Sequence, residues 1–363
     1  MEKPDMIRPL RRGWTTGACA AAASRAAYQA LLTGQFPDPV QVQLPGGVRP
    51  SFVLALNEFG PGFARAGIVK DAGDDPDVTH GALVVAMVRL APAGNGVTFQ
   101  AGEGVGTVTL AGLPLPPGEP AINPMPREMI RTAIAEAAAE YGGSSDVIVE
   151  ISIPGGEKIA ERTLNRRLGI IGGLSILGTT GIVVPYSCSA WIHSIYRGID
   201  VARAAGLTHL AGATGSTSET AVARLYGLPD AALIDMGDFV GGMLKYLRRH
   251  PVAQVTVAGG LAKMTKLGQG LLDLHSRRGE VDLDWLSART DDVELAKRIA
   301  GSNSAMEAFD HAKTTGIDLA MPVIDAAWRT AAGVLEGSDT TLEIVMFDRA
   351  GELLGRTGFR EIH

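Results

Sequence analysis

The segment 70–81, KDAGDDPDVTHG, holds the densest group of chemistry-bearing side chains in the first half of the chain. Four aspartates within seven positions could ligate a divalent cation, because hard cations favour clustered carboxylates. Their spacing matches no calcium-binding loop, and aspartates in turns also cap backbone amides. The pattern therefore favours a turn and leaves a ligand-contacting loop and a metal site as alternatives. Its polar residues are Lys70, Asp71, Asp74, Asp75, Asp77, Thr79 and His80.

A second candidate site is the segment 211–219, AGATGSTSE, which follows a predicted strand and precedes a predicted helix. In parallel α/β folds, ligand loops lie at the carboxyl end of a strand and open onto a helix. Ser216 or Thr217 is expected to cap this helix, with Glu219 completing a capping box. A loop that only connects the two elements is the alternative. The candidate ligand-binding residues are Gly212, Thr214, Gly215, Ser218, Glu219 and, at the end of the next strand, Asp235.

The segment 259–278 contains the densest basic cluster of the chain. Such clusters are usually solvated, but a substrate with several carboxylates would give them a binding role. The chain shows no Ser-His-Asp order, no metal-binding histidine pair and no P-loop, which disfavours hydrolases and kinases. The segment 102–109, GEGVGTVT, precedes no helix, so it predicts a β-bulge or tight hairpin and no phosphate cradle. The basic cluster comprises Lys263, Lys266, His275, Arg277 and Arg278.

The elements predicted for the first half indicate an α+β domain. A helix is expected from Thr15 or Thr16 to about Leu32, closed by Gly34. Six prolines in the segment 110–126 forbid regular structure there. The next helix is expected to begin at Pro126 and end at Gly142. Strands are predicted at 40–44, 51–56, 63–69, 146–154 and, as a hairpin, 82–90 with 97–100, and a short helix near 156–165.

The second half alternates strands with helices of roughly 10–15 residues, which is typical of βαβ units. It therefore predicts a Rossmann-like α/β domain with a mostly parallel sheet. The domains are expected at 1–185 and 186–363. Predicted strands cover 207–213, 231–237, 253–260 and a final 341–347, and predicted helices cover 187–205, 218–227, 238–250, 294–301 and 319–337.

The run 168–192 contains no charged side chain. Its length satisfies the roughly 20 apolar residues of a membrane helix. However, it contains five glycines and Pro185, and each glycine costs a helix about 1 kcal/mol relative to alanine. The run instead favours a buried glycine-rich crossover, where missing Cβ atoms let the backbone approach a neighbouring strand or a ligand.

The composition is that of an ordinary globular α/β protein, with 46% hydrophobic and 20% charged residues. A net charge of −6 argues against a nucleic-acid partner, because phosphate contacts need clustered Lys and Arg. The two cysteines, Cys19 and Cys188, lack metal-ligand spacing and are compatible with a reducing cytoplasm. We therefore expect a cytoplasmic protein without a membrane segment or a protein-bound metal. Homo-oligomerisation is left open.

Several long motifs together resemble the CbiD family of cobalt-precorrin-5B C(1)-methyltransferases of cobalamin biosynthesis. They are TTGACAAAA at 15–23, the segments 70–81 and 102–109, GLPLPPGEPAINPMPREMI at 112–130, and TLNRRLGIIGGLSILGTTGIV at 163–183. The resemblance implies S-adenosylmethionine as methyl donor and a cobalt-containing tetrapyrrole as acceptor. It also implies methylation at ring carbon 1, which yields cobalt-precorrin-6A.

This resemblance gives the candidate residues their expected roles. The donor is expected over the glycine loops of the second half, on the ligand-binding residues named above. No catalytic base is singled out, because alignment of an electrophilic methyl group with an electron-rich carbon is sufficient. The segments 214–219 and 258–263 depart from the family's pattern, which leaves the contacts there open. Expected substrate-binding residues are Thr15, Thr16, Lys70, Asp71, Asp74, Asp75, His80, Lys263 and His275.

Two other classes of function compete with the methyltransferase. A nucleotide-dependent oxidoreductase is suggested by the βαβ half, although it would need a tight GxGxxG opening a helix. A non-catalytic corrinoid-binding protein is suggested by the altered segments. Binding of S-adenosylmethionine and of NADPH distinguishes the three.

Overall fold

The structure is a computed structural model that describes residues 9–362. It divides into two compact units, which we call unit 1 and unit 2, with the division between Ser187 and Cys188. This division lies close to the domain boundary predicted after residue 185, and the first eight residues of the predicted first domain lie outside the described residues. Within 9–362, no helix is long and apolar enough to cross a membrane.

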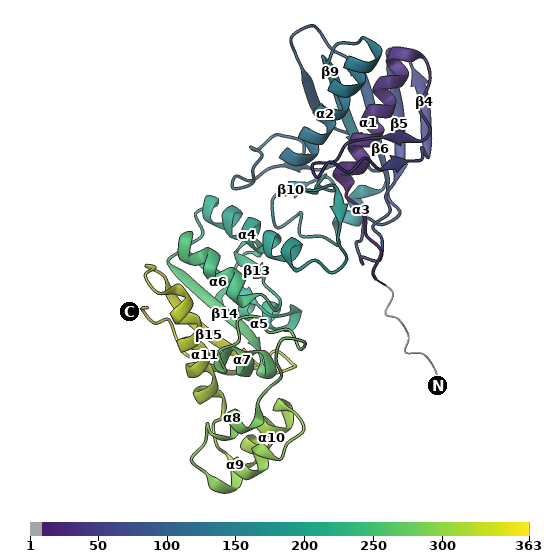
Figure 1. The fold of residues 1–363 in the computed structure, drawn as a ribbon. Helices are drawn as coiled ribbons and strands as arrows, with labels where there is room; N and C mark the ends of the chain where they lie inside the picture. The colour runs from purple at the N-terminus through teal and green to yellow at the C-terminus, as the bar shows by residue number, and fades with distance from the viewer. Residues whose placement is uncertain (1–8, 363) are drawn as a thin grey trace, which may run out of the picture. The chain divides into compact units, whose positions relative to one another are not determined.

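Unit 1 is built on a five-stranded sheet of order β4-β5-β6-β9-β7, with two helices packed on one face. The helices α1 and α2 run next to each other (Figure 1). The apolar residues of the strands alternate, so that one face meets the helices. The bounds are α1 (Thr16–Thr33), β4 (Leu56–Gly60), β5 (Phe63–Val69), β6 (Leu83–Leu90), β7 (Val97–Ala101), α2 (Pro124–Tyr141) and β9 (Val147–Ser152).

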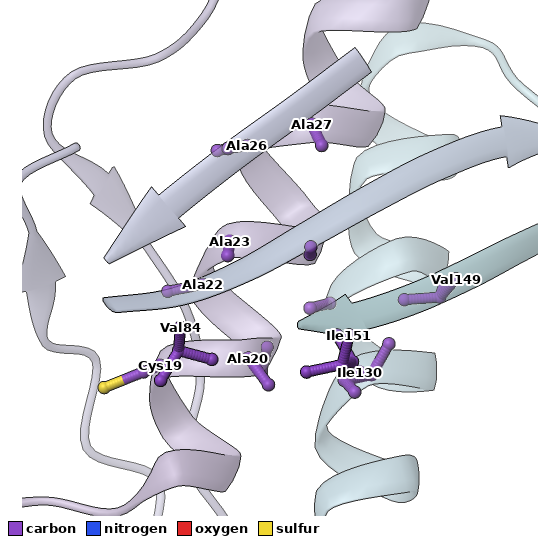
Figure 2. Close-up of a cluster of buried hydrophobic side chains, with 14 of the residues drawn as sticks. Cys19, Ala20, Ala22, Ala23, Ala26, Ala27, Val84, Ile130, Val149 and Ile151 are labelled. Carbon is purple, nitrogen blue, oxygen red and sulfur yellow. The ribbon is translucent and has the colours of Figure 1, made fainter. Parts of the chain in front are cut away.

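The alanine-rich helix α1 forms as predicted. Thr15 caps it by accepting a hydrogen bond from the Ala18 N–H at 3.2 Å, and Gly34 ends it in the left-handed conformation. The small alanine side chains let the helix approach β5 and β6 closely, as Figure 2 shows for a row from Ala20 to Ala27. Burial in this core raises the pKa of the Cys19 thiol to about 12. Cys19 is therefore a packing residue with no reactive thiolate.

The predicted hairpin of 82–90 with 97–100 is wrong. Strand β9 lies between β6 and β7, antiparallel to the first and parallel to the second. The connection 91–96 crosses the start of β9, where Asp146 accepts the Gly96 N–H on its carboxylate at 2.7 Å and the Ala91 N–H on its carbonyl oxygen at 2.9 Å. A short, turn-like connection between two strands therefore does not ensure that they pair with each other, because a third strand can lie between them.

The charge-free run forms a glycine-rich crossover and no long helix. A Cβ atom on Gly173 would lie 2.3 Å from the Gly104 backbone, and one on Gly178 would lie 2.3 Å from the Thr15 hydroxyl oxygen. These approaches bring distant segments into two-stranded pairings, so the segment 102–109 forms no hairpin of its own. The pairs are β1 (Gly13–Trp14) with β11 (Ile182–Val183), β8 (Thr107–Val108) with β10 (Ile170–Ile171), and β2 (Val40–Gln41) with β3 (Ser51–Phe52); α3 covers Gly156–Ala160.

Unit 2 is built on a five-stranded sheet of order β13-β12-β14-β15-β16. The first four strands are parallel, as the sequence predicts, and β16 is antiparallel. The segment 341–347 is therefore not the final strand, because β16 follows and covers its outer edge. The bounds are β12 (His209–Ala213), β13 (Leu233–Asp235), β14 (Gln254–Gly260), β15 (Thr341–Phe347) and β16 (Leu353–Arg356).

Both faces of this sheet are covered by helices. Residues of α5 join one core cluster with Ala211, Ala258 and Val345, whereas α4, α6, α7 and α11 join the other with Leu210 and Val257. The helices α8 to α10 are inserted between α7 and α11. The bounds are α4 (Cys188–Ala204), α5 (Ser216–Tyr226), the 3-10 turn Asp230–Ala232, α6 (Val240–Arg249), α7 (Leu261–Gly268), α8 (Leu283–Ser287), α9 (Val293–Ala300), α10 (Ala305–Thr315) and α11 (Ala320–Leu335).

The order of the parallel strands differs from the Rossmann order. Counted along the chain, these strands lie in the order 2-1-3-4, whereas a Rossmann sheet has the order 3-2-1-4-5-6. The observed order is the other common doubly wound arrangement, and it has its switch point between the first and third strands. Here these are β12 and β14, so ligand binding is expected at their carboxyl ends.

The close backbone contact at Gly104 allows a test of the glycine crossover. Gly104 has φ +72°, and a Cβ there would lie 2.0 Å from the Ile153 carbonyl oxygen. Gly142 has φ +75° with open space around it, so Gly142→Ala is the matched control. The control is expected to lose about 1–2 kcal/mol for the left-handed backbone alone. Gly104→Ala is expected to lose clearly more in urea unfolding, and equal losses would contradict the crowding argument.

Candidate functional site

A cavity of about 480 Å³ lies at the carboxyl ends of β12, β14 and β15 in unit 2. Four short segments line it: 214–218 after β12, 260–263 after β14, 304–306 at the start of α10, and 347–349 at the end of β15. The position is the switch point between β12 and β14. The volume lies within the roughly 300–1,000 Å³ of small-molecule sites.

Two helices begin at this cavity without a side-chain cap. The N-cap residues are Gly215 for α5 and Gly260 for α7, and among the described residues no side chain hydrogen-bonds to the first amides of either helix. The predicted caps Ser216 and Thr217 are therefore wrong, because the helix begins one residue earlier than a Ser216 cap requires. Uncapped first-turn N–H groups carry partial positive charge and favour an anionic group nearby.

Charged side chains at the cavity differ in how they are engaged. Lys263 pairs with Asp238 and also donates to the Leu274 carbonyl oxygen at 3.1 Å. The Asp348 carboxylate accepts the backbone N–H groups of Ala350 and Glu352, each at 2.8 Å. Arg349 is exposed on the lining. The cavity thus combines hydroxyls, uncapped helix amides and a cation with the apolar residues Leu261, Met306 and Phe347.

The residues predicted for a cofactor divide into two groups. Thr214, Gly215 and Ser218 line the cavity, whereas Gly212, Glu219 and Asp235 are not lining residues. Gly212 serves packing, because a Cβ there would lie 2.3 Å from the Met243 sulfur atom. Asp235 ends the edge strand β13, where its carbonyl oxygen accepts the Trp191 indole N–H at 3.0 Å.

Two lining segments were missed by sequence reasoning. Phe347, Asp348 and Arg349 follow a predicted strand, so the carboxyl-end argument applied to 211–219 could have found them. The segment 304–306 starts α10, with Ser304 accepting the Glu307 N–H at 3.3 Å. A Ser-x-x-Glu capping signal marks that start, but nothing local places it beside the sheet.

The predicted basic cluster is partly structural. Lys266 is buried and donates to the Leu274 carbonyl oxygen at 3.3 Å, the same oxygen that Lys263 reaches. His275 accepts the Arg277 N–H on Nδ1 at 3.1 Å within its own loop. Of this cluster, Lys263 alone is a lining residue of the cavity.

The other predicted residues gather in unit 1, around the N-terminal strand β1. Trp14 donates its backbone N–H to the Asp71 carbonyl oxygen at 2.7 Å, which joins the segments 9–17 and 70–81. Thr16 hydrogen-bonds to both backbone groups of Leu177 through its hydroxyl, accepting at 3.0 Å and donating at 3.2 Å. His80 accepts the Ala72 N–H on Nδ1 at 3.1 Å. Thr15, Thr16 and His80 thus hold the backbone together.

Each aspartate of the 70–81 segment is engaged within unit 1. Asp71 forms a two-bond ion pair with Arg11, which lowers the pKa of Asp71 to about 2. Asp74 accepts the Arg11 N–H at 2.6 Å, and Asp75 accepts the Tyr186 N–H at 2.8 Å. These bonds support the turn interpretation. Among residues 9–362, no group of three His, Cys, Asp or Glu side chains is placed to hold a metal ion.

Asp77 completes the turn through a buried ion pair. Its carboxylate lies 2.6 Å from the Lys70 ammonium nitrogen, and the Lys70 side chain is 1% exposed. It also accepts the Thr79 N–H at 2.7 Å and the Thr79 hydroxyl at 2.6 Å. Burial by itself raises the pKa of Asp77, but the Lys70 charge and these hydrogen bonds outweigh it, so the pKa of Asp77 lies below its ordinary value.

Comparison with known proteins assigns the family. The CbiD family model matches residues 3–185, and the model of the CbiD C-terminal domain matches residues 273–358. A cobalt-precorrin-5B C(1)-methyltransferase of Bradyrhizobium sp. is 65% identical over 96% of this chain and 94% of its own. The Agrobacterium fabrum protein of the same name is 62% identical over 96% of this chain and 93% of its own. The chain belongs to the CbiD family.

A solved CbiD-family structure is also similar. The crystal structure of cobalamin biosynthesis protein (cbiD) from Archaeoglobus fulgidus is 29% identical, covers 74% of this chain and 83% of its own, and gives a TM-score of 0.41.

The two CbiD family models leave residues 186–272 between their matches. The cavity loops 214–218 and 260–263 fall in that interval, whereas 304–306 and 347–349 fall within the C-terminal match.

The buried ion pair of this CbiD-family protein provides a stability test. Asp77→Asn is expected to lower the free energy of unfolding near neutral pH by roughly 3 kcal/mol, because Lys70 would stay buried without its counter-charge. The pKa of Asp77 is lower in the folded protein than in the unfolded chain. Its ion pair therefore stabilises the fold fully at pH values above the unfolded-state pKa, and this contribution is lost as the pH falls through the folded-state pKa. The difference between wild type and variant should therefore shrink below about pH 4.

Urea unfolding at neutral and acidic pH measures this difference. Lys70→Met is the control, because the Asp77 left behind is 26% exposed and can be hydrated. Its loss should be smaller than that of Asp77→Asn. A larger loss of unfolding free energy for Lys70→Met than for Asp77→Asn would contradict the assigned role of the Lys70–Asp77 ion pair. A difference between wild type and Asp77→Asn that stays constant in acid would also contradict it.

Proposed function

We propose that this CbiD-family protein is a cobalt-precorrin-5B C(1)-methyltransferase that uses S-adenosylmethionine as methyl donor. Curated relatives with this enzyme name are 57–65% identical over about 95% of the chain. The reaction adds a methyl group to ring carbon 1 of the tetrapyrrole. The expected product, cobalt-precorrin-6A, belongs to the same proposal.

The observation that carries the donor site is the cavity at the switch point of unit 2. Its volume of about 480 Å³ suits a molecule made of one nucleoside and one amino acid. A tetrapyrrole with several carboxylate arms is much larger than this cavity. The doubly wound order of unit 2 supports a nucleoside ligand, since such sheets bind nucleotides at the carboxyl ends of their strands.

The lining suits the two ends of the donor differently. The uncapped amides of α5 and α7, together with Arg349, would hold the carboxylate of its amino-acid part. Met306, which is half-buried, would contact the adenine, with the buried Leu261 and Phe347 forming the apolar wall behind it. The Asp348 carboxylate is held in place by two backbone N–H groups. Its negative charge would attract the positively charged sulfonium of the donor.

The chemistry asks mainly for alignment. When bound, the donor supplies a methyl group that is already electrophilic because it is attached to a sulfonium. The protein then needs to hold donor and acceptor in line and exclude water, which lowers the barrier without a strong general base. Rigid helix starts and strand ends are suited to that task, because their backbone is fixed by the sheet.

Binding of the donor tests this proposal by calorimetric titration with S-adenosylmethionine and, in parallel, NADPH. Saturable binding of S-adenosylmethionine without NADPH binding is expected, and NADPH binding alone would overturn the proposal. Ala262 is an exposed lining residue at the start of α7, so Ala262→Phe should fill the cavity and weaken donor binding by about tenfold or more. Ala300→Phe, at an exposed end of α9 away from the lining, is the matched control and should bind as wild type.

A further inference from the structure

Tyr186 has a backbone conformation that large residues rarely adopt. Its φ is +56°, and among residues 9–362 it is the one non-glycine residue with positive φ. For a bulky side chain this conformation is an outlier, and it persists only when the surrounding structure enforces it. A glycine would adopt it without strain. The tyrosine side chain is therefore present despite the backbone, which calls for a reason.

The acidic turn of unit 1 enforces this conformation. The Tyr186 N–H donates to the Asp75 carboxylate at 2.8 Å. The same turn is held by Arg11, whose backbone N–H donates to the Asp74 carboxylate at 2.6 Å and whose carbonyl oxygen accepts the Asp74 N–H at 2.9 Å. Asp75 thus links a braced turn to the strained residue. The backbone of Tyr186 is therefore fixed on unit 1 by specific hydrogen bonds.

The side chain of Tyr186 is presented to solvent. It is 68% exposed, and within the described residues its ring and hydroxyl form no ring contact and no hydrogen bond. Other exposed aromatic residues differ: Phe59 packs against Phe36, and the Trp191 indole donates to a backbone carbonyl. A strained backbone that displays an aromatic ring unengaged by unit 1 indicates a contact with something outside unit 1.

The surroundings of Tyr186 suit a flat, carboxylate-bearing ligand. Val184, two residues before Tyr186 in the charge-free run, is 48% exposed. The backbone of Arg12 lies against Gly73 in the braced turn, and its exposed guanidinium has no ion pair with the described residues. Of the aspartates nearby, Asp71 is neutralised by Arg11 and Asp77 by Lys70. Asp74 and Asp75 accept backbone N–H groups and keep their negative charge, so an anionic arm depends on the Arg12 guanidinium.

We propose that Tyr186 is a binding residue for the tetrapyrrole acceptor, with its ring against the conjugated macrocycle and Arg12 available to a carboxylate arm. This inference rests on the proposed function for the identity of the acceptor. Its evidence lies in unit 1 alone and is independent of the donor cavity. Aromatic contact contributes affinity beyond the area buried, and a guanidinium binds carboxylates through two parallel hydrogen bonds.

The decisive variant is Tyr186→Gly, because it removes the ring and relieves the backbone at once. Its melting temperature should be equal to or above that of wild type, while KM for cobalt-precorrin-5B rises by roughly tenfold with kcat and donor affinity little changed. Tyr186→Phe keeps the ring and should behave as wild type. Val53→Ala, at a 71% exposed position of unit 1 outside the segments 9–17, 70–81 and 168–192, is the control for a general loss of apolar surface and should leave KM unchanged.

A stable porphyrin with carboxylate arms, uroporphyrin, provides a second readout by fluorescence titration. Compared with wild type, Tyr186→Gly and Tyr186→Leu should bind uroporphyrin more weakly, whereas Tyr186→Phe should bind it with unchanged affinity. Unchanged KM and unchanged porphyrin affinity in both ring-deleted variants would overturn the inference. If wild type fails to methylate cobalt-precorrin-5B yet these variants lose porphyrin binding, the proposed function fails and the tetrapyrrole surface stands.

Discussion

The parallel pairing of β12 with β14 is the constraint on which the candidate donor site depends. The two strands are neighbours in register from His209 with Gln254 to Ala213 with Ala258. Each continues into a helix, and these helices pack on opposite faces of the sheet. The chain therefore diverges beyond the carboxyl ends and leaves space that no regular element fills. Both helix starts, with their unsatisfied amides, border that space.

Unit 1 depends on a different constraint, the close approach of backbones. Gly13 against Ala72, Gly104 against Ile153 and Gly173 against Gly104 leave no room for side chains. Gly13 against Ala72 joins β1 to the 70–81 motif, and Gly173 against Gly104 joins the 163–183 motif to the 102–109 motif. Gly178 against Thr15 likewise joins the 163–183 motif to the 15–23 motif, although long stretches of sequence separate all of them. Most polar side chains of these motifs form hydrogen bonds within the fold. The motifs that carry the family resemblance thus build much of the scaffold of unit 1.

The two units therefore suggest a division of chemistry between the substrates. Unit 2 has a small cavity that combines uncapped helix amides and hydroxyls with apolar residues, which suits binding and alignment of a small donor. Unit 1 has a rigid surface on which a braced acidic turn supports an exposed aromatic residue. Neither feature has the arrangement of a general base.

The sequence by itself determined the local elements and the family. Thr15 and Gly34 bound α1 because capping and a left-handed C-terminus are local properties. The alternation in unit 2 predicted its parallel sheet, and the loop after β12 was recognised from its position between a strand and a helix. The tertiary structure decided the rest. Insertion of β9 between β6 and β7, the strand order of unit 2, and the approach of 304–306 and 347–349 to the cavity depend on pairings between distant segments. Local propensity does not encode such pairings, because each strand edge can accept several partners and only the packed whole selects one.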